Sequence, residues 1–478
     1  MNARLPDVTL RGRMARARWI LIGSILGSGA VFVEGTVTTV ALPAIARDFH
    51  LGIAGLQWVM NGYLLTLSAL ILLGGALGDR FSRRRVFGVG LIGFAVASLG
   101  CALAPNITVL VVARILQGIS GALVVPNSLA LLETAFTGEA RGAAIGRWAA
   151  WSAVSTALGP LVGGWLIGVA SWRFVFVCIV PFAVAAVVAI NVGASACDDP
   201  PRDSARVDYL GAALATFGLG GVISALTDGP GGGFNRPPVL VAGIGGIIML
   251  VAFIVVERRV HHPLLPLEIF RSRQFSGVNA TTLVVYAALN GLFLFLMLQL
   301  QTVLGYSPIA AGASLLPIFG LMLLFSPLAG RVAARRGPRL PMVTGCLVAG
   351  LGALLFARVR PGANYWATAL PAALVFGIGL ACFVAPLTSV ALGALDERLA
   401  GLASGVNNAV ARLAGLLATA IIPLAIGLGG VDVLRADQLA TGFVRATIIC
   451  AVLCAAGAGV ATMTIGDSVE SSEASSPR

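Results

Sequence analysis

Long apolar stretches alternate with short polar gaps over almost the whole chain of 478 residues. A helix needs about 20 apolar residues to cross the hydrocarbon core of a bilayer, and fourteen of these stretches are long enough to do so. The pattern therefore predicts an all-α integral membrane protein. The predicted spans are 19–43, 56–76, 85–104, 107–128, 143–168, 173–193, 207–227, 238–257, 276–302, 309–333, 340–357, 365–392, 402–427 and 440–465.

The arginines are distributed unevenly among the polar gaps. The chain has no lysine, so arginine accounts for all 32 basic residues. With an even number of spans, 23 arginines fall on the side that holds both termini, 7 fall on the other side, and Arg114 and Arg412 lie within spans. Because basic residues stay on the cytoplasmic side of a membrane, we predict a multi-pass protein of the cell inner (plasma) membrane with both termini cytoplasmic.

The composition excludes an ordinary water-soluble protein. Hydrophobic residues make up 58% of the chain and charged residues 11%, whereas a soluble globular chain has about 25% charged residues. The formal net charge of +12 would suggest a nucleic-acid partner in a soluble protein. Here the arginines flank the spans and face anionic lipid, so we expect the lipid bilayer, and no nucleic acid, as a partner.

The chain carries few residues suited to metal or redox chemistry. Its seven cysteines and three histidines show neither zinc-ligand spacing nor a disulfide framework. We therefore expect no metal and no cofactor, and we interpret the cysteines as small apolar packing residues. The basic start precedes an apolar run of about 25 residues, longer than the core of a signal peptide, so we interpret it as an uncleaved first span.

Polar segments divide the spans into groups of six, two and six. The segment 75–84, after the second span, is weakly repeated at 330–339, in the corresponding place of the second half. Two six-span halves with matching loops suggest a transporter built from parallel repeats around a central cavity. The predicted parts are an N-terminal six-helix bundle (1–193), a cytoplasmic linker (194–206), a two-helix hairpin insert (207–257) with an external Gly/Pro tip, an interfacial cytoplasmic segment (258–275), a C-terminal six-helix bundle (276–465) and a disordered tail (466–478).

Two charged residues lie deep inside predicted spans. Arg114 lies in the fourth span, where a charge costs about 3 kcal/mol and should therefore be paired; a snorkelling side chain is the alternative. Glu34 is the acidic residue in the middle third of the first span. Burial disfavours the charged form of a carboxyl group, so Glu34 could take up and release protons. A structural hydrogen-bonded acid and a partner for a cationic substrate are the alternatives for Glu34.

Other polar and glycine-rich positions are candidates for the transport path. In the fifth span, residues 159–164 read Gly-Pro-Leu-Val-Gly-Gly. Proline removes one helical hydrogen bond and kinks a helix, and the glycines let a neighbouring helix pack closely. The candidate cavity residues are Trp58, Tyr63, Gln117, Asn290, Gln299, Gln301 and Arg412. Hydrogen bonds between helices, or snorkelling for Arg412, are equally good explanations of several of them.

These motifs resemble those of the major facilitator superfamily, and within it the fourteen-span drug:proton antiporter family, over nearly all of residues 15–465. Residues 75–85 are similar to the family's Gly-x-Leu-x-Asp-Arg-x-Gly-Arg-Arg signature, with Ser82 in place of the second glycine. The fourth span matches Arg-x-x-Gln-Gly through Arg114 and the following residues, and 159–164 matches the antiporter pattern Gly-Pro-x-x-Gly-Gly. Residues 34–43 resemble Asp-x-Thr-Val-x-x-Val-Ala-Leu-Pro, with glutamate in place of aspartate.

The resemblance implies a major facilitator fold, with two six-helix bundles and a two-helix hairpin insert, that acts as a monomer. It assigns proton coupling to Glu34 and Arg114. It assigns a cytoplasmic gate to the loop after the second span, through Asp79, Arg80, Arg83 and Arg84. It assigns an antiporter helix kink to Gly159, Pro160, Gly163 and Gly164.

The predicted function is proton-coupled export of small amphipathic compounds, such as drugs, antibiotics or lipophilic metabolites, by alternating access. Protons and a small-molecule substrate are then the expected partners. Import by proton symport on the same fold is the alternative, although the antiporter motif in the fifth span favours export. A membrane enzyme is disfavoured because no nucleophile lies beside a base, and the absence of a Walker A sequence excludes an internal ATPase. The intact gate motifs argue against a receptor that does not transport.

Overall fold

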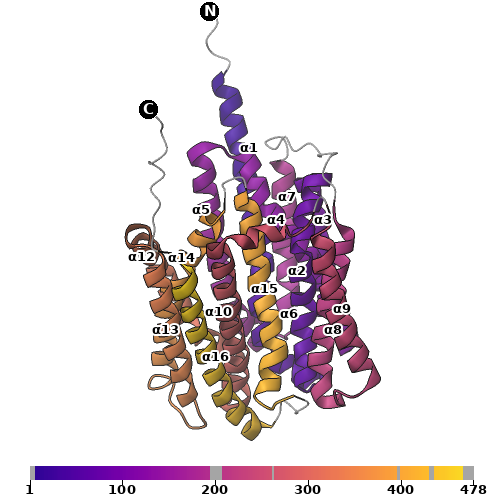
Figure 1. Ribbon diagram of the computed structural model, residues 1–478, viewed down its shortest axis with the longest axis vertical. Helices are drawn as coiled ribbons and strands as arrows, with labels where there is room; N and C mark the ends of the chain where they lie inside the picture. Colours follow the sequence, from indigo (N-terminus) through magenta and orange to yellow (C-terminus); the bar gives the residue numbers. More distant parts are fainter. Residues whose placement is uncertain (1–5, 194–206, 261–262, 396–398, 430–434, 467–478) are drawn as a thin grey trace, which may run out of the picture. The chain divides into compact units, whose positions relative to one another are not determined.

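The computed structural model describes residues 6–193, 207–260, 263–395, 399–429 and 435–466. Within these ranges the chain is all helical and contains no strand (Figure 1). The predicted linker 194–206 and residues 467–478 of the predicted tail lie outside the described residues. The longer helices are α1 (Pro6–Phe49), α2 (Ile53–Phe81), α3 (Arg83–Ala102), α4 (Ile107–Ala135), α5 (Gly138–Val169), α7 (Ile179–Val192), α8 (Tyr209–Gly232), α9 (Pro237–Glu257), α10 (Arg273–Leu298), α12 (Leu316–Arg336), α13 (Arg339–Leu355), α14 (Ala369–Gly393), α15 (Ala400–Ala425) and α16 (Ala436–Thr464).

Shorter helical segments complete the spans. They are α6 (Phe174–Val177), η2 (Leu267–Arg271), η3 (Gln299–Val303), α11 (Pro308–Ala313) and η4 (Phe356–Arg358). η3 is one turn of π-helix that continues α10, and α11 and α12 together form a single apolar span. Within the described part of the chain, fourteen helices or helix pairs are long and apolar enough to cross a membrane. The prediction of an all-α protein with fourteen spans is therefore confirmed.

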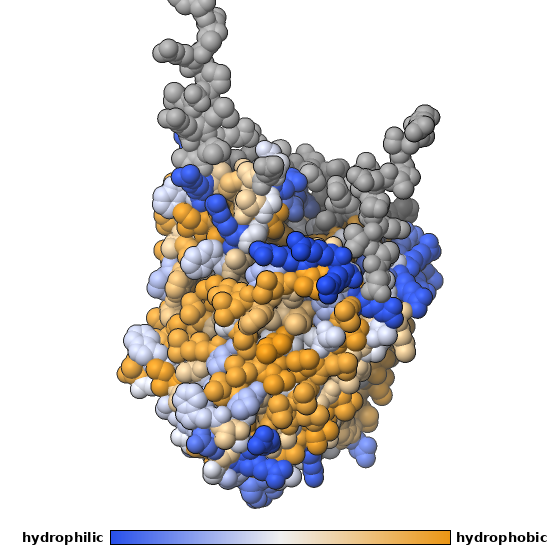
Figure 2. Space-filling view, turned by 90° about the vertical axis from the view of Figure 1, so that its left-hand side faces the viewer, coloured by the Kyte–Doolittle hydropathy of each residue, from blue (hydrophilic) through white to orange (hydrophobic). Residues whose placement is uncertain are grey.

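Hydrophobic side chains cover much of the outside of the helices. Figure 2 shows them over the middle of one face, with hydrophilic side chains toward its two ends. α9 is the clearest case, because its apolar residues point outward and only 6% of its most apolar window is buried. In hydrocarbon every backbone polar group must be bonded within the segment, which a continuous helix achieves. The exposed apolar surface is therefore the surface that lipid would cover.

Two segments differ from the sequence-based expectation. The segment 228–233, predicted as an external Gly/Pro tip, is mostly helical, because α8 continues to Gly232 and leaves only 233–236 as the connection. Pro230 lacks the N–H that would donate to the carbonyl of the residue four positions earlier, and the helix ends two residues beyond it. α10 begins at Arg273, three residues before the predicted span, and the short 3-10 helix η2 lies just ahead of it; the interfacial placement of 258–275 stays a prediction.

The chain divides into two units, which are described separately. One unit comprises 1–266, 293–313 and 415–442, and the other comprises 267–292, 314–414 and 443–478. In the first unit, glycines let helices approach closely: side chains in place of Gly74 and Gly118 on facing helices would overlap the backbone of Ala122 and of Tyr63. The second unit has its own apolar core, which includes Val278, Met342, Cys346, Phe383 and Ala458. The predicted division into bundles 1–193 and 276–465 stays a prediction.

Candidate functional site

A buried ion pair joins α1 to α4 in the first unit. The Nη1 atom of Arg114 lies 2.5 Å from Oε1 of Glu34, and the two side chains are 1% and 0% exposed. Removing both charges from water costs several kcal/mol per ion, which the pair recovers only if its remaining polar atoms are also bonded. The sequence placed these two residues in separate spans, and the fold brings their charges into contact.

Neighbouring groups bond most of the polar atoms of the pair. Arg114 donates from Nε to the carbonyl oxygen of Val59 at 3.0 Å and from Nη1 to Oε1 of Gln117 at 2.6 Å. Thr38, one turn along α1, donates to Oε1 of Glu34 at 2.8 Å. The guanidinium carbon also lies 4.4 Å from the centre of the Tyr63 ring, in a cation–π contact. The arginine is therefore held at several points, independently of the carboxylate.

One oxygen of the carboxylate is different. Among the described residues, Oε2 of Glu34 is fully buried and has no hydrogen-bond partner. An ionised carboxylate with a bare buried oxygen loses solvation that nothing replaces. A proton on Oε2 would remove the charge there while Oε1 keeps its bonds. This geometry suits a group that alternates between charged and neutral forms.

Two residues predicted to line a substrate cavity contact this ion pair, and their place in a cavity stays a prediction. Gln117 accepts from Arg114 and donates from Nε2 to the hydroxyl of Ser98 at 2.8 Å. Tyr63 donates from its hydroxyl to the carbonyl oxygen of Val31 at 3.1 Å and stacks its ring on Arg114. Both side chains are buried. They position the ion pair from α4 and α2 respectively.

The loop between α2 and α3 forms a second cluster of charges. Arg83 donates from Nε and Nη2 to Oδ1 of Asp79, at 3.0 and 2.8 Å, and from Nη1 to the carbonyl oxygen of Ala130 at 3.1 Å. Arg84 donates to the side chain of Asn191 at 3.0 Å. Arg80 lies over the ring of Phe81. Arg83 thus ties the end of α2 to α4, while Arg84 ties the start of α3 to α7.

Ser82, which separates α2 from α3, has an unusual backbone. Its φ is +93°, a value that L-residues with a side chain rarely adopt. The resemblance places a glycine at this position, and glycine adopts positive φ without steric cost. The chain therefore keeps the turn of the motif but makes it with a residue that strains the backbone. The sequence left open whether serine preserves this turn, and the structure answers that it does.

The glycines of the 159–164 motif contact two different neighbours. Side chains in place of Gly159 and Gly163 would overlap Thr36 and Val37 of α1, and one in place of Gly164 would overlap the backbone of Pro308 at the start of α11. A side chain on Gly312 of α11 would in turn meet the carbonyl of Pro160. The motif therefore brings α5 against α1 on one side and α11 on the other. The role of these four residues in antiport stays a prediction.

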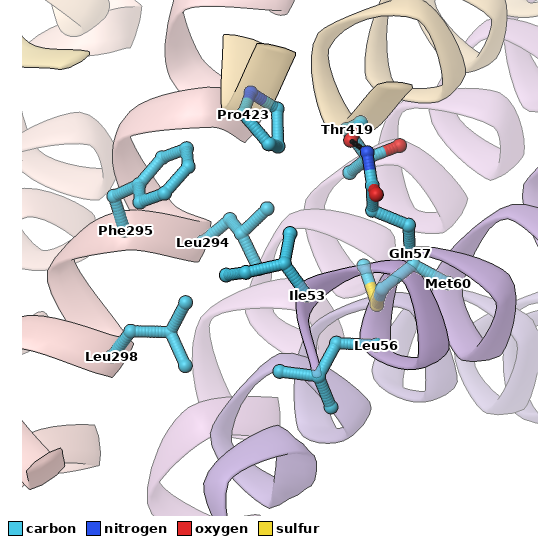
Figure 3. Close-up of a pocket in the computed structure, with 9 residues that line it drawn as sticks. All are labelled: Ile53, Leu56, Gln57, Met60, Leu294, Phe295, Leu298, Thr419 and Pro423. Atoms are coloured by element: carbon cyan, nitrogen blue, oxygen red, sulfur yellow. Dashed lines mark hydrogen bonds between the residues drawn. The ribbon is translucent and has the colours of Figure 1, made fainter. Parts of the chain in front are cut away.

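A small apolar pocket lies among α2, α10 and α15 in the first unit (Figure 3). It is lined by Ile53, Leu56, Gln57, Met60, Leu294, Phe295, Leu298, Thr419 and Pro423. None of the seven predicted cavity residues is among them. The sequence did not single out this pocket because its lining is almost entirely apolar and looks like ordinary helix packing.

The other predicted cavity residues are spread over both units. Trp58 donates its indole N–H to Asp228 of α8 at 3.0 Å, and Gln301 donates to the carbonyl oxygen of Val40 at 3.0 Å. Gln299 is buried. In the second unit, Asn290 donates to the carbonyl oxygen of Tyr286 in its own helix, and Arg412 is half-buried. Their contribution to a substrate cavity stays a prediction.

Several polar residues that join helices carried no sequence signal strong enough to be selected as sites. Gln57 donates to the carbonyl oxygens of Thr419 and Ala420, at 2.7 and 3.3 Å, and the hydroxyl of Thr419 donates to Oδ1 of Asn61. Asp228 follows the predicted span 207–227 and was expected in the external Gly/Pro tip of the hairpin. Asparagine and glutamine are common in membrane helices as interhelical glue, so their partners emerge only from the fold. Among the described residues, no group of three or more histidine, cysteine or acidic side chains could hold a metal ion.

Comparisons with known proteins agree with this architecture. Residues 24–419 match the family model described as Major Facilitator Superfamily. A puromycin resistance protein of Streptomyces alboniger is 35% identical over 88% of this chain and 85% of its own length. A tetracenomycin C resistance and export protein of Streptomyces glaucescens is 34% identical over 88% of this chain and 77% of its own length.

A solved structure gives the same fold. It is a bacterial homolog of the human lysosomal transporter Spinster, described as inward-facing and unoccupied. The TM-score is 0.64, with 17% sequence identity, and the match covers 94% of this chain and 98% of the other. At that level of identity the likeness concerns the fold.

Proposed function

The chain belongs to the major facilitator superfamily, and on that premise we propose that it exports small amphipathic compounds in exchange for protons, by alternating access. The observation that carries the proposal is the ion pair of Glu34 and Arg114, buried within a bundle of apolar helices. Charges at that depth are costly and mark ion or substrate pathways. The relatives are named for resistance and export, which favours export over import.

The proton is carried by Glu34 in this proposal. Oε2 of Glu34 is the buried oxygen without a partner, so it is the atom that receives the proton. Protonation removes the negative charge that faces Arg114, while Arg114 keeps its bonds to Val59 and Gln117. The guanidinium then faces a neutral partner, and its positive charge stabilises the return of the carboxylate when the proton leaves. Proton uptake and release thus change the electrostatic balance between α1 and α4.

The exported compounds share their chemistry with the antibiotics for which the relatives are named. Puromycin and tetracenomycin C appear in the names of two relatives, and we extend that class to this chain as amphipathic ring-bearing molecules. In this state the pocket at Met60 and Phe295 is too small to hold a ring; in the proposal its apolar side chains become surface for such rings when α2 and α15 separate. The predicted cavity residues Asn290 and Arg412 remain candidates for the polar part of the substrate.

The membrane setting completes the proposal. The protein is a multi-span membrane protein, and we place it in the plasma membrane with both termini cytoplasmic, on the strength of the arginine asymmetry. The Asp79–Arg83 pair then lies at the cytoplasmic end of α2, where it serves as a gate. We also propose that the chain acts as a monomer, as the resemblance of its motifs implies. We assign no enzymatic activity.

Transport by the purified protein tests the proposal. The protein is reconstituted into lipid vesicles, and a pH gradient is imposed across their membrane. Uptake of puromycin or a cationic dye is measured for the protein molecules whose cytoplasmic face points out of the vesicle, because for them uptake corresponds to export. We expect accumulation against the concentration gradient that collapses when a protonophore is added. Accumulation that persists after the protonophore would contradict proton coupling, and the absence of transport for the whole class would contradict the export function.

A further inference from the structure

The hairpin of α8 and α9 is bonded to α2 by a carboxylate inside the helical region. Asp228, in the last two turns of α8, accepts the indole N–H of Trp58 on Oδ1 at 3.0 Å and the hydroxyl of Ser224 on Oδ2 at 3.2 Å. Both Trp58 and Asp228 are half-buried. A hydrogen bond to a charged acceptor is about twice as strong as a neutral one. The bond therefore fixes where the first turns of α2 lie against the hairpin.

The same turns of α2 are bonded on another side to α15. Gln57 donates to two carbonyl oxygens of α15, at Thr419 and Ala420, and Asn61 accepts the hydroxyl of Thr419. Successive residues of a helix point about 100° apart, so the neighbours Gln57 and Trp58 face different partners. α2 is thus bonded to α15 through Gln57 and to the hairpin through Trp58 at the same level.

A third contact brings the hairpin directly to the end of α15. A side chain in place of Gly429, just after α15, would overlap the ring of Pro230, two residues beyond Asp228. Farther along α8, a side chain in place of Gly220 would be in ordinary contact with Leu65 of α2. The hairpin therefore contacts α2 and the segment that follows α15, and Asp228 lies between these two contacts along α8.

We propose that Asp228 is a positioning residue of the transport cycle. Through Trp58 it holds α2 in the place where Gln57 and Asn61 bond to Thr419, so the hairpin stabilises the state in which α2 and α15 are joined. This inference rests on the proposed function, because alternating access requires α2 and α15 to separate in another state. The inserted helices then set how often this junction opens.

The experiment measures opening of the junction directly. Met60 lines the pocket between α2 and α15 and is 7% exposed, so a cysteine there reacts with a water-soluble reagent only when the junction opens. M60C is placed in a chain whose seven cysteines have been replaced, after export by that parent has been verified. The rate of modification by a membrane-impermeant maleimide is measured from each side, in cells and in inside-out vesicles.

Four variants of this M60C chain are compared. Trp58→Phe removes only the indole N–H, Asp228→Leu removes the acceptor, and Asp228→Asn retains an acceptor oxygen. Trp148→Phe is the control for loss of an indole N–H, because Trp148 donates to the neutral hydroxyl of Ser28 on α1 at 2.8 Å, outside the hairpin. We expect Trp58→Phe and Asp228→Leu to raise the modification rate about tenfold, as the loss of one charge-assisted bond implies. Asp228→Asn should label at an intermediate rate, because its amide oxygen is a neutral and weaker acceptor, and Trp148→Phe should label at the parent rate.

The outcomes separate the two proposals. Unchanged labelling in both Trp58→Phe and Asp228→Leu would overturn the role of Asp228, and so would equal acceleration by Trp148→Phe. Labelling does not require transport, so it reports on the hairpin even if no substrate is exported. Conversely, vesicles that export under a pH gradient with unaltered labelling in the variants would sustain the proposed function and reject this inference.

Discussion

Arg114 and Glu34 face each other across α1 and α4 with practically no exposed surface, and Arg114 has further partners that Glu34 lacks. This asymmetry separates the roles of the two charges. The arginine is anchored whatever the state of its partner, while the carboxylate has one oxygen free to change its protonation. Predictions for the two residues therefore differ in kind.

Replacing Glu34 by glutamine should abolish uphill export while leaving the protein folded. The amide has the shape of the acid but cannot release a proton, so the cycle loses its driving reaction. Transport of puromycin into vesicles under a pH gradient checks the result, with Glu34→Asp as the control that keeps the carboxyl group. Uphill transport by Glu34→Gln would place the proton route elsewhere in the chain.

Removing Arg114 should destabilise the protein more than removing Glu34. Arg114→Ala leaves a carboxylate buried without its counter-charge, a loss of about 3–5 kcal/mol, unless Glu34 becomes protonated. The midpoint of thermal unfolding in detergent should fall markedly, and the Glu34→Gln, Arg114→Ala double variant should recover part of the loss. Arg114→Lys should restore function only in part, because lysine lacks the planar fork of donors. Additive losses, with the double variant less stable than Arg114→Ala by the full cost of Glu34→Gln, would show that the pair is not coupled.

Replacing Ser82 by glycine should stabilise the turn between α2 and α3. A non-glycine residue at φ +93° stores strain of about 1–3 kcal/mol, which glycine relieves, less the entropy that glycine loses on folding. We expect a higher midpoint of thermal unfolding for Ser82→Gly. The midpoint should be unchanged for Ser82→Ala, which keeps the Cβ. A lower midpoint for Ser82→Gly would mean that the serine side chain stabilises the folded protein by more than its strained backbone destabilises it.

Substituting Gly164 should block export through packing alone. A Cβ at this position overlaps the backbone of Pro308, so Gly164→Ala forces α5 and α11 apart. The matched control is Gly168→Ala, one turn further along α5, where a Cβ meets nothing within 4 Å. Membrane expression and export are measured for both variants. Normal export by Gly164→Ala would contradict the packing role, and loss of export by Gly168→Ala would point to a general sensitivity of α5.

Neutralising Asp79 should slow transport at least about tenfold without unfolding the protein. The pair with Arg83 is partly exposed, with 42% of the aspartate side chain accessible, and exposed pairs contribute only about 0–1 kcal/mol to stability. Asp79→Asn should therefore express and unfold like the wild type while its export rate falls. Wild-type export by this variant would remove Asp79 from the gate.

The sequence by itself determined the membrane class, the number of spans and the charges that matter. Fourteen apolar stretches separated by polar gaps allow little except fourteen helices, since a helix satisfies its own backbone in lipid. The same reasoning selected Glu34 and Arg114, because a charge among apolar residues is expensive and is kept only where it is paired or functional. It also identified Ser82 as a departure from a glycine in the turn motif.

Only the tertiary structure decided which side chains meet. Tyr63 and Gln117 complete the Glu34–Arg114 network because α2 and α4 pack closely at Gly118, and no sequence pattern paired them with it. Asp228 was expected in a loop, yet it accepts a bond from Trp58 across 170 residues of sequence. Hydropathy records how costly a polar residue is in lipid, but it does not name the residue's partner. The partner depends on how the helices pack. Small residues and backbone shape determine that packing only when all the helices are assembled.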